Sequence, residues 1–177
     1  MSILKVARMG HPVLRTKTPV LERADIKTAA VQRLIDDMIE TMYEYHGVGL
    51  AAPQVHESVR LFVAVLDARE PGHDDVEVEP VVLINPDITV VGTDVFEDWE
   101  GCLSIPNIRG RVPRAREIKV RAYDRTGARV EISAHDFPAR VIQHEADHLD
   151  GVLFLDRMES FETLTFLEEY SRYWIHD

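Results

Sequence analysis

The chain is short of cysteine, of long apolar runs and of basic residues, and each shortage excludes a class of protein. Cys102 is the single cysteine, so no disulfide can form within the chain, which favours a reducing compartment. No apolar run reaches the length of about eighteen residues that a membrane-spanning helix needs, and the N-terminus lacks the pattern of a signal peptide. We therefore expect a cytoplasmic protein that has no membrane partner.

The charge balance is strongly acidic. Lys and Arg number 20 against 31 Asp and Glu, a formal charge of −11, which disfavours binding to DNA because phosphate backbones attract clustered basic residues. The densest basic group is expected to be the solvated face of a strand or loop: Arg109, Arg111, Arg114 and Arg116. With 177 residues, 45% of them apolar, the chain fits one domain spanning 1–177.

The spacing of apolar residues predicts three helices. The first covers residues 25–45, ends at Gly47, and has apolar residues three and four positions apart: Val31, Leu34, Ile35, Met38, Ile39 and Met42. The second begins near Asp136 as N-cap, with Pro138 in its first turn, and stops at Gly151. The third covers residues 160–174, with its glutamates in water and an apolar face packed inward: Phe161, Leu164, Phe166 and Leu167.

Short β-branched or alternating runs predict strands at residues 60–66, 81–84, 117–123 and 128–133, the last pair joined by a turn at 124–127. Residues 67–80, rich in Asp, Glu, Pro and Gly, are expected to form an exposed loop. The expected architecture is a small α+β domain of mostly antiparallel sheets. They would pack around the second helix as a central helix, with an N-terminal and a C-terminal helix outside.

The second predicted helix carries the pattern His144-Glu145-Ala146-Asp147-His148. The histidines are four positions apart, so both imidazoles project from one face and can share a metal ion. Glu145 lies about 100° further around the helix and can reach a water on that ion without displacing it. Two nitrogen ligands and a nearby carboxylate are what metal-assisted hydrolysis requires.

The third ligand distinguishes the possible classes of metalloprotein. The longer zinc-protease pattern requires a third histidine where this chain has Phe154, which excludes that class. A glutamate of the last helix is one alternative, with Glu162, Glu168 and Glu169 as candidates. Cys102 is the other, because its thiolate with two imidazoles leaves a coordination position open for water, whereas structural zinc sites close with four protein ligands.

The glycine-rich segment 47–52 formally fits a dinucleotide-binding fingerprint, but it follows a helix and is interrupted by Pro53. Its glycines suit instead a path where backbone approaches a ligand closely. Gln54, just beyond, is either a surface amide or a hydrogen-bond donor into a cleft.

Three segments in order resemble the signature motifs of the peptide deformylases: Gly47-Val48-Gly49-Leu50-Ala51-Ala52-Pro53-Gln54, Glu100-Gly101-Cys102-Leu103-Ser104 and Gln143-His144-Glu145-Ala146-Asp147-His148. The similarity extends over nearly the whole chain, including residues 11–15 and Ile105-Pro106 with Arg109. The resemblance implies a hydrolase that removes the N-formyl group from the formylmethionine of nascent polypeptides and releases formate.

The resemblance also implies the site residues. Cys102, His144 and His148 match the metal ligands, and Glu145 matches the general base and acid that assists metal-activated water in attacking the formyl carbon. The Gln54 side chain and the Leu103 backbone N–H match the donors to the oxyanion. One divalent ion is implied, with Fe²⁺ first and Zn²⁺, Ni²⁺ and Co²⁺ as alternatives that the ligand set also accepts.

The formyl-methionyl peptide is expected to lie extended beside the glycine segment and the segment before Cys102. Candidates for the methionine pocket are Val48, Gly49, Gly101 and Val141. Some family members associate with the ribosome through a basic C-terminal helix, but the last nineteen residues here carry Arg172 against Glu159, Glu162, Glu168, Glu169 and Asp177, which argues against docking through this element.

Two rival hypotheses stay open on the sequence. One is a metallopeptidase that uses the same helix with a glutamate as third ligand. The other is a binding module in which the ion only stabilises the fold and no general base is needed.

Overall fold

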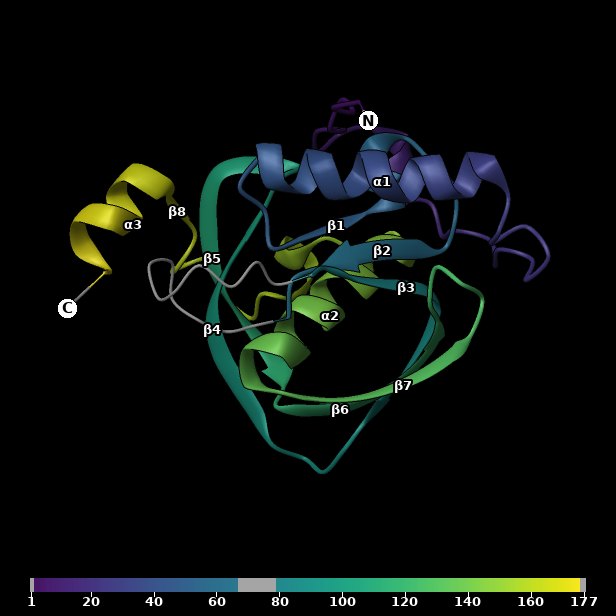
Figure 1. The fold of residues 1–177 in the computed structure, drawn as a ribbon. Helices are drawn as coiled ribbons and strands as arrows, with labels where there is room; N and C mark the ends of the chain where they lie inside the picture. The colour runs from purple at the N-terminus through teal and green to yellow at the C-terminus, as the bar shows by residue number, and fades with distance from the viewer. Residues whose placement is uncertain (1, 67–78, 176–177) are drawn as a thin grey trace.

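The computed structural model describes residues 2–66 and 79–175, which form two sheets around helix α2 (Asp136–Leu149) (Figure 1). The first sheet has the order β1-β2-β3-β6-β7, and the second has the order β4-β5-β8. All strand pairs are antiparallel. The prediction of an α+β fold with antiparallel sheets around a central helix is confirmed.

The strands of the first sheet are β1 (Gly49–Ala51), β2 (Leu61–Ala64), β3 (Val81–Val90), β6 (Glu117–Tyr123) and β7 (Arg129–His135). Those of the second are β4 (Val95–Cys102), β5 (Ile105–Ala115) and β8 (Thr165–Phe166). Helix α1 (Ala29–Glu44) lies across β1 and β2, and α3 (Leu167–Tyr173) lies beside the second sheet (Figure 1).

Helix α1 begins later and ends earlier than the apolar periodicity predicted. Thr28 is its N-cap, with the side-chain oxygen accepting a hydrogen bond from the N–H of Val31, and such caps define where a helix starts. At the other end the helix stops at Glu44, and His46, not Gly47, adopts the left-handed conformation, with φ of 54°. The Gly47 N–H then donates to the Met42 carbonyl, which leads the chain directly into β1.

Strand β3 is longer than the predicted 81–84, because a bulge lets the strand continue through Pro86. The register with β6 shifts between Ile84 and Asp87, and Asn85 adopts a φ of 53°. The Asn85 side chain accepts a hydrogen bond from the N–H of Leu21 and donates one to its carbonyl. Proline cannot donate to a ladder and is tolerated in strands at bulges, so the pattern breaks in sequence while the strand persists.

The hairpin of β4 and β5 was not predicted, and neither was the short strand β1. The hairpin contains proline, glycine and many charged residues, which are poor strand signals. Cys102 pairs with Ile105, so Leu103 and Ser104 form the tight turn between the strands. The basic group expected to be solvated lies on β5 and beside it, and Arg114 contradicts that expectation because it is 5% exposed and ion-paired.

Helix α2 is enclosed on most of its surface, which the sequence predicted only in part. It runs from Asp136 to Leu149 with His135 as N-cap, so Asp136 opens the first turn and is not the cap. Its apolar residues Ala139, Val141, Ile142 and Leu149 join a core with β2, β3, β6 and β7. The strands contribute Phe62, Leu83, Ile118, Val120 and Ala134. Gly151 has a φ of 75° and lies so close to Arg15 that a Cβ there would be 2.8 Å from its carbonyl carbon.

The C-terminal prediction was wrong in extent and in packing. The helix covers only Leu167–Tyr173, is preceded by β8, and has no buried residue. Phe161 is 67% exposed and Phe166 is 66% exposed. Phe166 pairs with Ile108 on the edge strand β8 and is not part of a core. Trp99 of β4 contacts Tyr170 of α3, with ring centroids 4.8 Å apart, so α3 packs against the second sheet.

The predicted loop at 67–80 lies almost wholly outside the described residues, so it stays a prediction. Among the helices that the structure describes, none is both long and apolar enough to cross a membrane.

Candidate active site

Cys102, His144 and His148 converge beneath the turn between β4 and β5. One ligand atom from each lies within 4.8 Å of the other two, and all three residues are buried. The Cys102 Sγ is 3.3 Å from the His148 Nε2. Helix α2 supplies the histidines from adjacent turns of one face, and the end of β4 brings the thiol against that face.

This geometry fits one metal ion. Bond lengths of about 2.3 Å to sulfur and about 2.0–2.1 Å to nitrogen place the two donors of a tetrahedral ion about 3.5 Å apart. The separation of Cys102 Sγ from His148 Nε2 is close to that value. Burial favours the neutral thiol, but the charge of His148 and the hydrogen bonds from both histidines outweigh it and hold the pKa of Cys102 well below its usual range. The thiolate is the form that binds metal.

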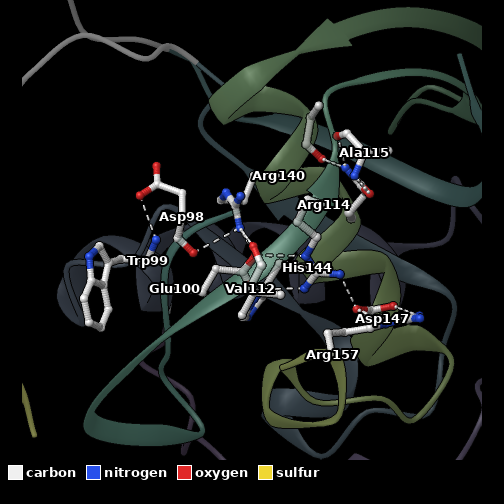
Figure 2. Close-up of polar contacts among 12 residues, drawn as sticks. Asp98, Trp99, Glu100, Val112, Arg114, Ala115, Arg140, His144, Asp147 and Arg157 are labelled. Carbon is white, nitrogen blue, oxygen red and sulfur yellow. Dashed lines mark hydrogen bonds and ion pairs between the residues drawn. The ribbon is translucent and has the colours of Figure 1, made fainter. Parts of the chain in front are cut away.

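Glu100 fixes the orientation of His144. Its Oε2 lies 2.8 Å from the His144 Nδ1, and its carboxylate also accepts hydrogen bonds from Arg114, at 2.9 Å from Nε and 3.0 Å from Nη2 (Figure 2). Burial would raise the pKa of Glu100, but the hydrogen bonds and charges of His144 and Arg114 outweigh it and lower that pKa. An ionised carboxylate only accepts, so the proton sits on Nδ1 and the His144 Nε2 is free for a metal.

Arg114 connects the carboxylate of Glu100, on β4, to the carboxylate of Asp147, on α2. Its Nη1 donates to Asp147 at 2.5 Å, and Arg157 donates to the same carboxylate at 2.6 Å (Figure 2). The charges of Glu100 and Asp147, with their hydrogen bonds, overcome burial and raise the pKa of Arg114. These ion pairs hold helix α2 on the face that carries His144. The pairing offsets the desolvation free energy that each charge would cost if it were buried alone.

Glu145 lies beside the cluster and is 4% exposed. Burial raises the pKa of Glu145 to about 7, although the charges of both histidines oppose the rise. Its Oε2 is buried without a hydrogen-bond partner among the described residues, so it is available to a group that enters the cleft. Gly49 makes this position possible, because a Cβ on Gly49 would lie 2.7 Å from the Glu145 carboxyl carbon.

Gln54 is 1% exposed and its amide is held in one orientation. Its Oε1 accepts a hydrogen bond from the N–H of Ala51 at 2.8 Å, which directs Nε2 toward Cys102 Sγ at 3.4 Å and Ser104 Oγ at 3.3 Å. Gln54 is therefore not a surface amide. Leu103 lies at the tight turn next to Cys102 and lines the same cleft.

A cleft of about 400 Å³ opens on these residues and runs between β1 and β4, which are both edge strands. The residues proposed for a methionine pocket all line it, from the buried Val141 to Val48, which is 49% exposed. The remainder of the lining is mixed in charge and includes Arg8, Tyr45, His46, Trp99, Pro106, Asn107, Arg109, Phe137, Arg140 and Leu167.

Four polar residues behind the ligands were not predicted from the sequence: Glu100, Arg114, Arg140 and Asp147. Glu100 and Asp147 lie within the recognised motifs, and the rule that a metal-binding histidine donates its second nitrogen to a carboxylate is the signal that could have identified Glu100. Arg114 and Arg140 carried no such signal, because only the fold turns these charges inward. The glutamates considered as rival ligands, Glu162, Glu168 and Glu169, are not part of the cluster that the described residues form.

Comparison with known proteins gives one consistent result. The family model described as polypeptide deformylase matches residues 3–163. A protein of Nostoc sp. named peptide deformylase 2 is 45% identical over 168 residues, 95% of this chain and 93% of that protein. The peptide deformylase of Salinibacter ruber is 46% identical over 164 residues, 90% of this chain and 82% of that protein.

Solved structures agree with the sequence relatives. The crystal structure of the Thermotoga maritima peptide deformylase superposes with a TM-score of 0.78 at 39% identity, covering 90% of this chain and 100% of that one. A class I type b peptide deformylase of Acinetobacter baumannii with Met-Ala-Ser bound gives a TM-score of 0.81 at 38% identity, covering 89% of this chain and 100% of that one.

Proposed function

The chain belongs to the peptide deformylase family, metallohydrolases that remove N-formyl groups, and we propose how its own residues carry out that reaction. The observation that carries the proposal is the buried triad of Cys102, His144 and His148 with Glu145 beside it in one cleft. The catalytic unit in this proposal is a single domain spanning residues 1–177.

Cys102, His144 and His148 hold one divalent ion in this proposal. When bound, the ion lowers the pKa of water and polarises a carbonyl oxygen. We place Fe²⁺ first because of the family resemblance, and Zn²⁺, Ni²⁺ and Co²⁺ follow because soft sulfur and imidazole ligands accept each of them.

Glu145 is the general base and then the general acid. It takes a proton from the water that attacks the formyl carbon and returns it to the departing amine. A carboxyl group with a pKa of about 7 can hold and release a proton near neutral pH. Its Oε2 has no hydrogen-bond partner in the part of the chain that the structure describes, so it can accept that proton.

The Gln54 side-chain amide and the Leu103 backbone N–H stabilise the negative charge on the formyl oxygen. Each such donor contributes about 2.7–4 kcal/mol when it is aimed at the developing charge. The hydrogen bond from Ala51 supports this role for Gln54, because it orients the amide before substrate arrives.

The substrate is a formyl-methionyl nascent peptide that lies extended between β1 and β4, since each is an edge strand of its sheet among the described residues and could pair with a peptide. Val48, Gly49, Gly101 and Val141 surround the methionine side chain. The bound Met-Ala-Ser of the Acinetobacter baumannii neighbour supports this substrate class.

We place the reaction in the cytoplasm, with transient ribosome association through a surface other than α3. Helix α3 presents Glu168 and Glu169 around Arg172, and the ion pairs among them leave no excess of positive charge for RNA. No DNA or membrane partner is proposed.

The test is formate release from formyl-Met-Ala-Ser by anaerobically purified protein, with metal content measured on the same sample. We expect formate and about one bound ion per chain. If reconstitution with Fe²⁺, Zn²⁺, Ni²⁺ and Co²⁺ in turn yields no formate, the assignment fails. Replacing Cys102 by Ser separates the rival metallopeptidase, because that enzyme would keep its metal and this one loses it.

A further inference from the structure

Arg140 is a buried arginine whose position the reaction described above does not explain. It lies on α2 four residues before His144, lines the cleft and is 3% exposed. A buried ion pair is weak evidence for stability alone, because well-packed apolar residues in its place often stabilise a protein as well. Stability alone therefore does not account for the buried charge, and the contacts of the guanidinium indicate its role.

One end of the guanidinium contacts the carboxylate that orients His144. The Arg140 Nη1 donates to the Glu100 Oε1 at 2.8 Å, whereas His144 contacts the other oxygen, Oε2 (Figure 2). Arg114 and His144 supply the other hydrogen bonds, so each oxygen of Glu100 accepts two. These four hydrogen bonds, one of them from Arg140, restrict rotation of the Glu100 carboxylate.

The other contacts of Arg140 are with the backbone of the hairpin. Nη2 donates to the Phe96 carbonyl at 2.9 Å, and Nη1 donates to the Val112 carbonyl at 2.8 Å. The guanidinium carbon also lies 4.5 Å from the centre of the Phe96 ring. Strand β4 is an edge strand that pairs only with β5 among the described strands, so these contacts connect the hairpin to α2.

We infer that Arg140 is a positioning residue that ties strand β4 to the carboxylate of Glu100 and so sets the orientation of His144 relative to the wall of the substrate cleft. A planar guanidinium can bind a carboxylate and two carbonyls at once, which neither a lysine nor an apolar side chain can do. The link to substrate rests on the proposed function, whereas the link to His144 does not.

The experiment compares Co²⁺ binding by the wild-type chain and the variants Arg140→Met and Arg140→Lys, using chelator competition and the visible absorption spectrum of the loaded protein. Arg140→Met should bind Co²⁺ up to about tenfold more weakly and show shifted absorption bands. Loss of a ligand's direct hydrogen-bond partner lowers affinity by about 10–100-fold, and Arg140 acts one step further out, through Glu100. The Co²⁺ affinity and spectrum of Arg140→Lys should lie between those of the wild type and Arg140→Met. A lysine restores the positive charge beside Glu100 but cannot donate to the carboxylate and both carbonyls at once. With formyl-Met-Ala-Ser, kcat should fall more than KM rises.

Arg116→Met is the matched control. Arg116 contacts the same Phe96 ring, with its guanidinium carbon 4.8 Å from the centre, but it is exposed, pairs with Asp136 and does not touch Glu100. This variant should retain the wild-type affinity and spectrum.

An Arg140→Met protein with wild-type Co²⁺ affinity and spectrum would overturn the inference, even if its melting temperature fell, because a purely structural role predicts that result. If Arg140→Met does not fold, a wild-type spectrum and affinity in Arg140→Lys overturns it instead. A wild-type protein that releases no formate would refute the proposed function, while the Co²⁺ comparison would still decide the role of Arg140.

Discussion

Helix α2 and the C-terminal segment distribute polar and apolar side chains in opposite ways. In α2 the charged residues Glu145 and Asp147 are buried, and so is Arg140. In the C-terminal segment 161–174, which includes β8 and α3, Phe161, Phe166 and Trp174 are exposed. A charge is buried at high cost unless it is paired, whereas an exposed apolar side chain costs little, so the first arrangement points to function more strongly than the second.

The largest expected effect is the loss of formate release when Glu145 of α2 is replaced. Replacing it by Gln keeps the shape of the side chain but removes the proton acceptor, so formate release should fall by about 10²–10⁴-fold. Metal content, measured on the same sample, should stay at the wild-type level because Glu145 is not a ligand. Substantial residual activity would favour a different base, and loss of metal would show that Glu145 supports the ion.

The second largest expected effect is a loss of metal affinity when Glu100 is replaced. Glu100→Ala leaves His144 without its acceptor, and the affinity for Co²⁺ should fall by about 10–100-fold in a chelator competition. Glu97→Ala is the matched control on the same strand, since the Glu97 side chain is 43% exposed and pairs with Arg111. Equal losses in the two variants would argue against any special role for the buried carboxylate.

Packing separates the two regions in a third way. Leu149 at the end of α2 is fully buried, so Leu149→Ala should lower the free energy of unfolding by about 2–5 kcal/mol. Phe166→Ala removes a side chain that is 66% exposed and should change it by no more than about 0.5 kcal/mol. Urea unfolding of both variants tests this, and a large loss for Phe166 would show that the C-terminal segment shares the core.

The smallest effect concerns the ion pair just beyond α2. Burial raises the pKa of Asp150, but the hydrogen bond and charge of Arg60, with a contribution from Lys17, outweigh burial and lower that pKa. A lowered folded-state pKa means that the stabilisation is present above the unfolded value of about 3.9 and is lost as the pH falls through the folded value. Asp150→Asn should therefore cost less than about 1 kcal/mol at pH 7, because the pair is partly exposed. Urea unfolding over acidic pH should show the two proteins converging, and a difference that persisted at low pH would assign the effect to something other than charge.

The ordered motifs of the sequence were sufficient for the family, the metal-binding helix and the central position of that helix. Local rules carried this far because helix periodicity places His144 and His148 on one face and because strands β6 and β7 alternate cleanly. The same rules missed the hairpin of β4 and β5, since its prolines and charges are unfavourable in an isolated strand, and they assigned the C-terminal apolar residues to a core that the fold does not provide.

What the tertiary structure alone decided is the environment of the charges. Nothing in the local sequence distinguishes Arg114 from an exposed arginine. It is buried because β5 packs against α2, where Arg114 forms ion pairs with Glu100 and Asp147. The position of Arg140 depends in the same way on strand β4, which comes from a distant part of the chain. Whether a charge faces water or a carboxylate depends on contacts between distant segments, and these are absent from any local pattern.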